Sequence, residues 1–132
     1  MKKSLLILML MFSISAFAQD NEGARKVFCE LVGTGKLMSS KIVVSVDFGQ
    51  ETNFWTGASK QYLVDENGKA KTFNSMVDAM NFMGKLGWDF EQAYVVTSGQ
   101  QNVYHWLLSK QISKDEELKE GLTTKENYNK EK

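Results

Sequence analysis

The segment Phe73–Trp88, FNSMVDAMNFMGKLGW, constrains the fold most, because it has a clear helical period. Its apolar residues recur at spacings of three and four, which places them in one stripe along a helix. They are Met76, Val77, Met80, Met83 and Leu86. Asn74 or Ser75 can cap the start, and Ser75 and Asp78 have the spacing of a capping box. Gly87 suits the left-handed conformation that ends a helix. The pattern predicts one principal helix over about 75–86, with Trp88 folding back beside its last turn.

Two segments before this helix have the composition of β-strands. Lys26–Val32 is rich in β-forming residues, and alternate residues of Lys41–Phe48 are apolar from Ile42 onward. Such alternation is typical of a sheet that is packed on one side only. The short connection between the two segments predicts that they pair antiparallel.

Two β-hairpins are predicted in the rest of the chain. The first turns at Asn67-Gly68, a dipeptide typical of type I′ turns, and this register places Tyr62 opposite Phe73. In the second hairpin, Phe90–Ser98 pairs with Val103–Lys110, and small residues face large ones on one side. The facing pairs are Ala93–Leu108, Val95–Trp106 and Thr97–Tyr104. We expect the helix to cover this side of the hairpin.

The opposite side of the second hairpin is less polar than a solvated surface. It carries Tyr94, Val96, His105 and Leu107. Such a patch is either covered by another part of the chain or contacts a partner protein or a second subunit. Two further aromatic residues, Phe54 and Trp55, lie in a polar loop, where they form a binding tip or a plug beneath the loop. These six residues are the candidate binding residues.

The first eighteen residues have the pattern of a cleaved signal peptide. Lys2 and Lys3 precede the apolar run Leu5–Phe12, and Ala16-Phe17-Ala18 supplies the small residues of a cleavage site. The apolar run is too short to span a bilayer. We therefore expect export to the periplasm or the extracellular space, with no stable membrane insertion after cleavage.

The predicted organisation is a signal peptide over 1–18, one α+β domain over 19–112 and a charged, flexible tail over 113–132. The domain is expected to hold an antiparallel sheet of four to six strands with the helix on one face. Cleavage removes two of the 16 basic residues and none of the 16 acidic ones, so the formal charge changes from zero to −2. Without a basic cluster, nucleic acid is not an expected partner.

The residue inventory presents no catalytic or metal-binding constellation. Cys29 and His105 are the single cysteine and the single histidine, and both lie within predicted strands. Zinc sites are built mostly from several such residues, and the glycines form no phosphate-binding loop. We therefore predict neither a metal nor a cofactor. Four carboxylates remain as candidates for acid–base chemistry if two of them share a deep pocket. They are Asp47, Glu51, Asp65 and Asp89.

Residues 80–110 combine a helix that contains Asn81, the sequence Gly87-Trp88-Asp89 and a last strand with the pattern Tyr104-x-Trp106-Leu107-Leu108-x-Lys110. This combination resembles a family of small bacterial domains of unknown function, in which a helix ends in Asn…Gly-Trp-acidic before a β-hairpin. The resemblance implies a helix–hairpin architecture and no particular activity.

The sequence therefore favours an exported, non-enzymatic binding or interaction module. Its expected partner is a protein, a component of the cell envelope or a second copy of the chain. The alternative is a small carboxylate-based hydrolase or ligand-processing enzyme.

Overall fold

The computed structural model describes residues 23–35, 38–51 and 61–131. The predicted signal peptide and the Phe54-Trp55 loop lie outside these residues. Within them, no helix has both the length and the apolar character that crossing a membrane requires.

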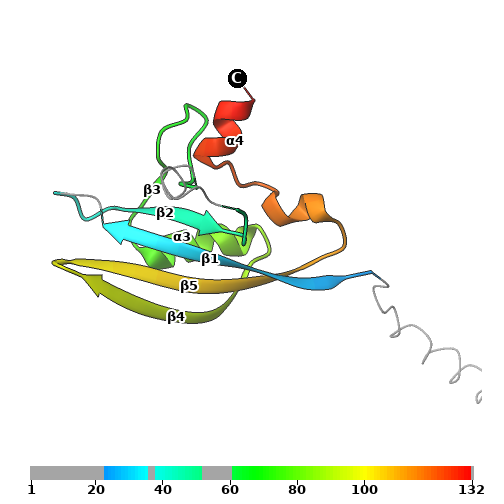
Figure 1. The fold of residues 1–132 in the computed structure, drawn as a ribbon, viewed down its shortest axis with the longest axis horizontal. Helices are drawn as coiled ribbons and strands as arrows, with labels where there is room; N and C mark the ends of the chain where they lie inside the picture. The colour runs from blue at the N-terminus through cyan, green and yellow to red at the C-terminus, as the bar shows by residue number, and fades with distance from the viewer. Residues whose placement is uncertain (1–22, 36–37, 52–60, 132) are drawn as a thin grey trace, which may run out of the picture.

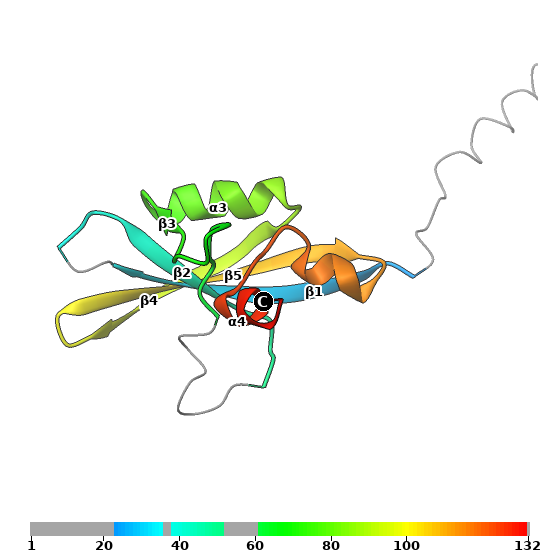
Figure 2. The same ribbon diagram turned by 90° about the horizontal axis from the view of Figure 1, so that it is seen from above.

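The described residues form a five-stranded antiparallel sheet with α3 packed on one face (Figures 1 and 2). The elements are β1 (Arg25–Gly35), β2 (Ile42–Asp47), β3 (Thr72–Phe73), α3 (Met76–Lys85), β4 (Asp89–Ser98), β5 (Gln101–Ile112), η2 (Asp115–Lys119) and α4 (Lys125–Lys130). The strand order is β3-β2-β1-β5-β4, so β1 occupies the centre and β4 one edge. The predicted α+β class, with one principal helix on an antiparallel sheet, is confirmed.

Local interactions define both ends of α3. The Ser75 hydroxyl accepts a hydrogen bond from the Asp78 backbone N–H at 3.2 Å. At the other end, Gly87 adopts a φ of 87°, and the Trp88 N–H donates to the Met83 carbonyl at 3.2 Å. This arrangement closes the helix and buries Trp88 beside its last turn, as predicted.

The helix packs over the centre of the sheet and leaves the edge strand β4 uncovered, whereas Leu108 of β5 is buried in the core. Met76, Ala79 and Met83 are its buried residues, whereas Val77, predicted to lie on the buried stripe, is 60% exposed. Met76 lies so close to β1 that a Cβ added at Gly33 would sit 2.2 Å from its sulfur. Gly33 therefore continues β1 beneath the helix, where the sequence predicted an interruption after residue 32.

Consequently the prediction that the helix covers one side of the second hairpin is wrong for β4, the edge strand. Every β4 residue from Asp89 to Thr97 is exposed, including Ala93 and Val95, which were expected beneath the helix. The hairpin register is also shifted by two residues, so Ala93 faces Trp106 and the turn lies at Gly99-Gln100. Because side chains alternate with a period of two, the shift leaves each residue on its predicted face.

The first hairpin has an odd-length turn in place of the predicted type I′ turn. Val64 pairs with Ala70, and the Asp65 N–H donates to the Lys69 carbonyl at 2.9 Å. The Asp65 carboxylate accepts from the N–H groups of Asn67 at 2.9 Å and Lys69 at 3.0 Å, which stabilises this longer turn. The predicted facing of Tyr62 and Phe73 is therefore lost, and both residues instead pair with β2.

The C-terminal segment is packed, in contrast to the flexible tail predicted from residue 113. Leu122 is 6% exposed and belongs to the hydrophobic core. The Val64 N–H donates to the Thr123 carbonyl at 2.9 Å, and the Lys125 N–H donates to the Tyr62 carbonyl at 2.9 Å. The segment docks because the outer side of residues 61–64 offers backbone groups that need partners. Two apolar residues, Leu118 and Leu122, carry the docking into the core, and two such positions are too weak a pattern to recognise in the sequence.

Candidate functional site

The face of the sheet opposite α3 is the strongest candidate site in the described residues. Strand alternation places residues of β1, β4 and β5 on this surface, which we call the far face. They include Phe28, Glu30, Val32, Tyr94, Val96, His105 and Leu107. Phe28, Tyr94 and Val96 are 49%, 45% and 47% exposed, while Val32, His105 and Leu107 are half-buried between them. The far face is therefore a largely apolar surface that is open to solvent.

Three polar side chains meet at the centre of the far face. The rings of Tyr94 and His105 are stacked, with centroids 4.7 Å apart and an interplanar angle of 5°. The Tyr94 hydroxyl donates to Glu30 Oε1 at 2.7 Å, and His105 Nδ1 lies 3.4 Å from the same oxygen. His105 Nδ1 makes no hydrogen bond within the described residues, so Tyr94 is the donor that Glu30 uses. The cluster holds the Tyr94 ring in a fixed orientation on the surface.

The hydrogen bond to Glu30 raises the pKa of Tyr94, and burial and the negative charge of Glu30 act in the same direction. All three effects disfavour the phenolate, because deprotonation would remove the donor and place two negative charges side by side. Tyr94 therefore presents a neutral aromatic ring at neutral pH.

A second polar group borders the far face beside Phe28. Glu91 of β4 forms an ion pair with Lys26 of β1 and accepts a hydrogen bond from the Ser109 hydroxyl of β5. The hydrogen bond from Lys26 is the main cause that lowers the pKa of Glu91, with the bond from Ser109 second. The Lys26 ammonium lies 5.3 Å from the centroid of the Phe28 ring. The charges of Lys26 and Glu91 pair with each other at the border of the far face and add no unpaired charge to its centre.

The structure brings together four of the predicted binding residues. Tyr94, Val96, His105 and Leu107 share the far face with neighbouring positions. Phe28, Glu30 and Val32 were not predicted, although they occupy alternate positions of the predicted first strand. Recognising them required the strand order, which places β1 next to β5.

The single cysteine and the single histidine lie on opposite faces of the sheet. His105 pairs with Val32, whereas Cys29 pairs with Leu108 and is buried on the α3 side. Burial, followed by the negative charge of Asp47, raises the pKa of the Cys29 thiol to about 12. The thiol is therefore protonated at neutral pH and packs as a small apolar side chain.

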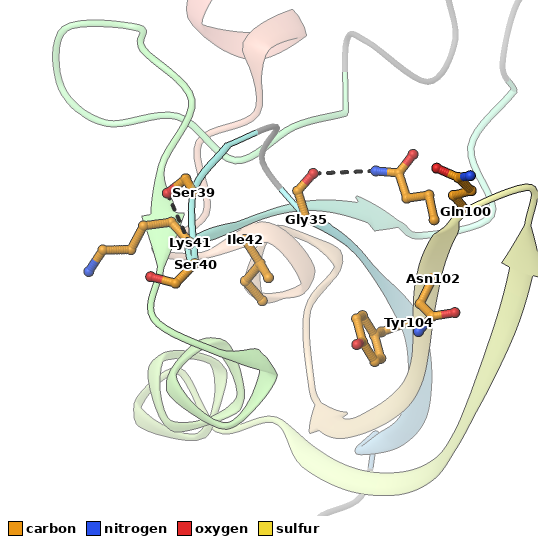
Figure 3. A pocket seen from close by; sticks show the side chains of 9 residues that line it. Gly35, Ser39, Ser40, Lys41, Ile42, Gln100, Asn102 and Tyr104 are labelled. Atoms are coloured by element: carbon orange, nitrogen blue, oxygen red, sulfur yellow. Dashed lines mark hydrogen bonds between the residues drawn. The ribbon is translucent and has the colours of Figure 1, made fainter.

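A separate recess of about 630 Å³ lies where the turn before β2 approaches the turn between β4 and β5 (Figure 3). Its lining residues are Gly35, Ser39, Ser40, Lys41, Ile42, Gln100, Gln101, Asn102 and Tyr104. Figure 3 shows Lys41 pointing away from Tyr104, and its ammonium donates to the Asn74 side chain. The recess offers hydroxyl and amide groups around one phenol ring, and none of the described residues that line it is a carboxylate.

The four candidate carboxylates do not line this recess. Asp65 is engaged in the turn of the first hairpin, Asp47 and Asp89 lie in different strands, and Glu51 is exposed at the limit of a described range. Within ranges 23–35, 38–51 and 61–131, no three His, Cys, Asp or Glu side chains are grouped to hold a metal ion.

No protein-family model, curated protein or solved structure matches the chain. The resemblance of residues 80–110 to a family of small bacterial domains therefore stays a prediction. The helix–hairpin order that this resemblance implies is present as α3, β4 and β5.

Proposed function

We propose that the chain is an exported, non-enzymatic protein-interaction module that binds its partner through the far face. The observation that carries this proposal is the exposure of Phe28, Tyr94 and Val96, each near one half, on one face of the sheet. Large apolar side chains grouped on a surface gain free energy when a partner removes them from water. A purely structural domain gains nothing from leaving them exposed.

The chemistry of the far face indicates the kind of partner it fits. Tyr94 is a rigid aromatic ring that contacts a partner with little loss of conformational entropy. Glu30 provides a carboxylate acceptor beside this ring. Its Oε1 atom accepts a hydrogen bond from the Tyr94 hydroxyl at 2.7 Å. The matching surface is apolar with a basic or N–H donor group positioned to reach Glu30.

The export part of the proposal depends on the first eighteen residues, with Lys2 and Lys3 before an apolar run. N-terminal sequencing of the protein from its own cell envelope should begin at Gln19. An intact N-terminus would contradict export by signal cleavage.

Site-specific photo-crosslinking tests the binding part of the proposal. A photoreactive residue at Val96 on the far face is compared with one at Val77, an exposed apolar residue on α3. We expect a discrete cross-linked partner from position 96 in the cell envelope and none from position 77. The same product from both positions, or no product from position 96, would refute binding through the far face.

A charge substitution on the far face, with a matched control on α3, tests the same proposal. Val96→Lys places a charge on the far face and should abolish the cross-link from a photoreactive residue at Phe28. Val77→Lys makes the same chemical change on the helix and should leave that cross-link intact.

A further inference from the structure

The two edges of the sheet differ in how far other segments of the chain cover them. At the β2 edge, residues 61–64 pair with β2, as the Leu63 N–H donates to the Val44 carbonyl at 3.0 Å. Thr124 then covers the outer side of Leu63. At the opposite edge, β4 has β5 as its one strand partner in the sheet (Figure 1). Half of the backbone groups of β4 therefore face outward, away from β5.

The open edge lacks the features that prevent edge-to-edge pairing. Proteins protect such edges with charged side chains, prolines or bulges. In β4, the acidic residues Asp89 and Glu91 and the bulge between Phe90 and Gln92 are confined to its beginning. The following stretch, Gln92–Ser98, contains no charged residue and no proline, and Val95 at its centre is 52% exposed.

The uncharged stretch matches a second copy of itself. When two β4 strands run antiparallel with Val95 opposite Val95, residues 92–98 of one copy pair with the same residues of the other. Tyr94 of each copy then faces Val96 of the other, an aromatic and β-branched pair that stabilises antiparallel sheets. Glu91 faces Gly99 of the other copy, so no acidic residues stand opposite one another.

We propose that two copies of this chain pair through Gln92–Ser98 of β4 to form one continuous sheet across a two-fold axis. Because the same stretch of each copy pairs with itself across the axis, the pairing closes as a dimer and does not continue into a filament. The formal charge of the chain is zero, or −2 without its first eighteen residues, so repulsion between copies is weak.

The dimer goes beyond the proposed function, because it is held by the outward backbone groups of β4, whereas the proposed partner binds the side chains of the far face. Residues opposite each other in an antiparallel pair point to the same side of the sheet. The two far faces therefore become neighbours on one side of the dimer, and a partner meets two copies of Tyr94 at once.

Sedimentation equilibrium of residues 19–132 tests the proposal at concentrations up to roughly 1 mM, where even weak pairing is populated. We expect a reversible dimer of the wild-type chain. Val95→Lys puts two ammonium groups opposite each other at the axis and should raise the dissociation constant roughly tenfold or more. Val95→Thr keeps a β-branched, uncharged residue and should still dimerise, as should Val77→Lys, which adds the same charge on α3.

A wild-type chain that stays monomeric over this range would overturn the proposal. Equal effects of Val95→Lys and Val77→Lys would also overturn it. Amide hydrogen exchange gives a readout independent of variant folding, because protection of residues 93–97 should increase with the concentration of the wild-type chain. Protection that is constant with concentration would contradict pairing at this edge. A cross-link from position 96 to a second copy of the chain reports the dimer, whereas a cross-link to a different protein reports binding through the far face, so failure of one proposal is distinguishable from failure of the other.

Discussion

Substitution of Gly33 by alanine tests how α3 is seated on the sheet. Gly33 lies in the interior of β1, where alanine would ordinarily be favoured over glycine by roughly 0.5–1 kcal/mol because glycine loses more backbone entropy on folding. The added Cβ would however lie 2.2 Å from Met76 Sδ and 3.2 Å from Met76 Cε. Real carbon and sulfur atoms do not approach so closely, so the Met76 side chain has to move.

The cost of this movement exceeds the gain in backbone entropy. Met76 is buried against the core, and overpacking at such a site costs about 1–3 kcal/mol. After subtraction of the entropic gain, we expect Gly33→Ala to lower the free energy of unfolding by up to about 2.5 kcal/mol. For a domain of this size the melting temperature should fall by up to roughly 15 °C.

Urea denaturation of the variant and of a matched control measures the effect. Gly35 lies two residues further along the same strand, and a Cβ there meets no atom within 4 Å. Gly35→Ala should therefore leave stability unchanged or raise it by up to about 1 kcal/mol. Equal stabilities of the two alanine variants would refute the close packing of Met76 on Gly33.

A double-mutant cycle assigns the cost to this contact. Met76→Ala alone should cost about 2–5 kcal/mol, because it removes a buried side chain. In the Met76→Ala background the space around Gly33 is empty, and Gly33→Ala should no longer destabilise the protein. Additive effects of the two substitutions would show that the clash with Met76 is not the cause.

Two further predictions concern the C-terminal segment and the far face. Leu122→Ala should lower the free energy of unfolding, measured by urea denaturation, by about 2–3 kcal/mol. Thr123→Ala changes the exposed neighbouring residue and should have little effect. Equal, small effects of both substitutions would contradict docking of this segment. Glu30→Gln should lower the pKa of Tyr94 toward its ordinary value of 10.0, as followed by ultraviolet titration of the phenol with Tyr94→Phe to assign the signal. Because the pKa of Tyr94 is raised in the folded state, its contribution to stability is present below 10.0 and is lost as the pH rises through the folded pKa; this alkaline loss should be smaller in Glu30→Gln, and an identical titration of Tyr94 in both proteins would contradict the contact.

Features that depend on neighbouring residues were predictable from the sequence. The Ser75 cap, the turn at Gly87 and the burial of Trp88 all follow from interactions within one or two helical turns. The antiparallel pairing of β1 and β2 was also predicted, because the connection between the two segments is short.

Turn types and strand registers were not predictable where the sequence permits two alternatives of similar stability. Asn67-Gly68 permits a type I′ turn, but the Asp65 carboxylate stabilises a longer turn by accepting two backbone N–H groups. The second hairpin keeps the same faces in two registers that differ by two residues, so its sequence pattern does not distinguish them.

Part of the candidate site was predictable from the sequence. The apolar side of the 90–110 hairpin indicated Tyr94, Val96, His105 and Leu107, since alternation alone determines which residues share a side. Only the tertiary structure decided that this side is exposed, that α3 lies over β1, and that Phe28 and Glu30 join the surface. The physical reason is that a strand pattern determines where a side chain points, whereas its burial depends on segments that are distant in the sequence.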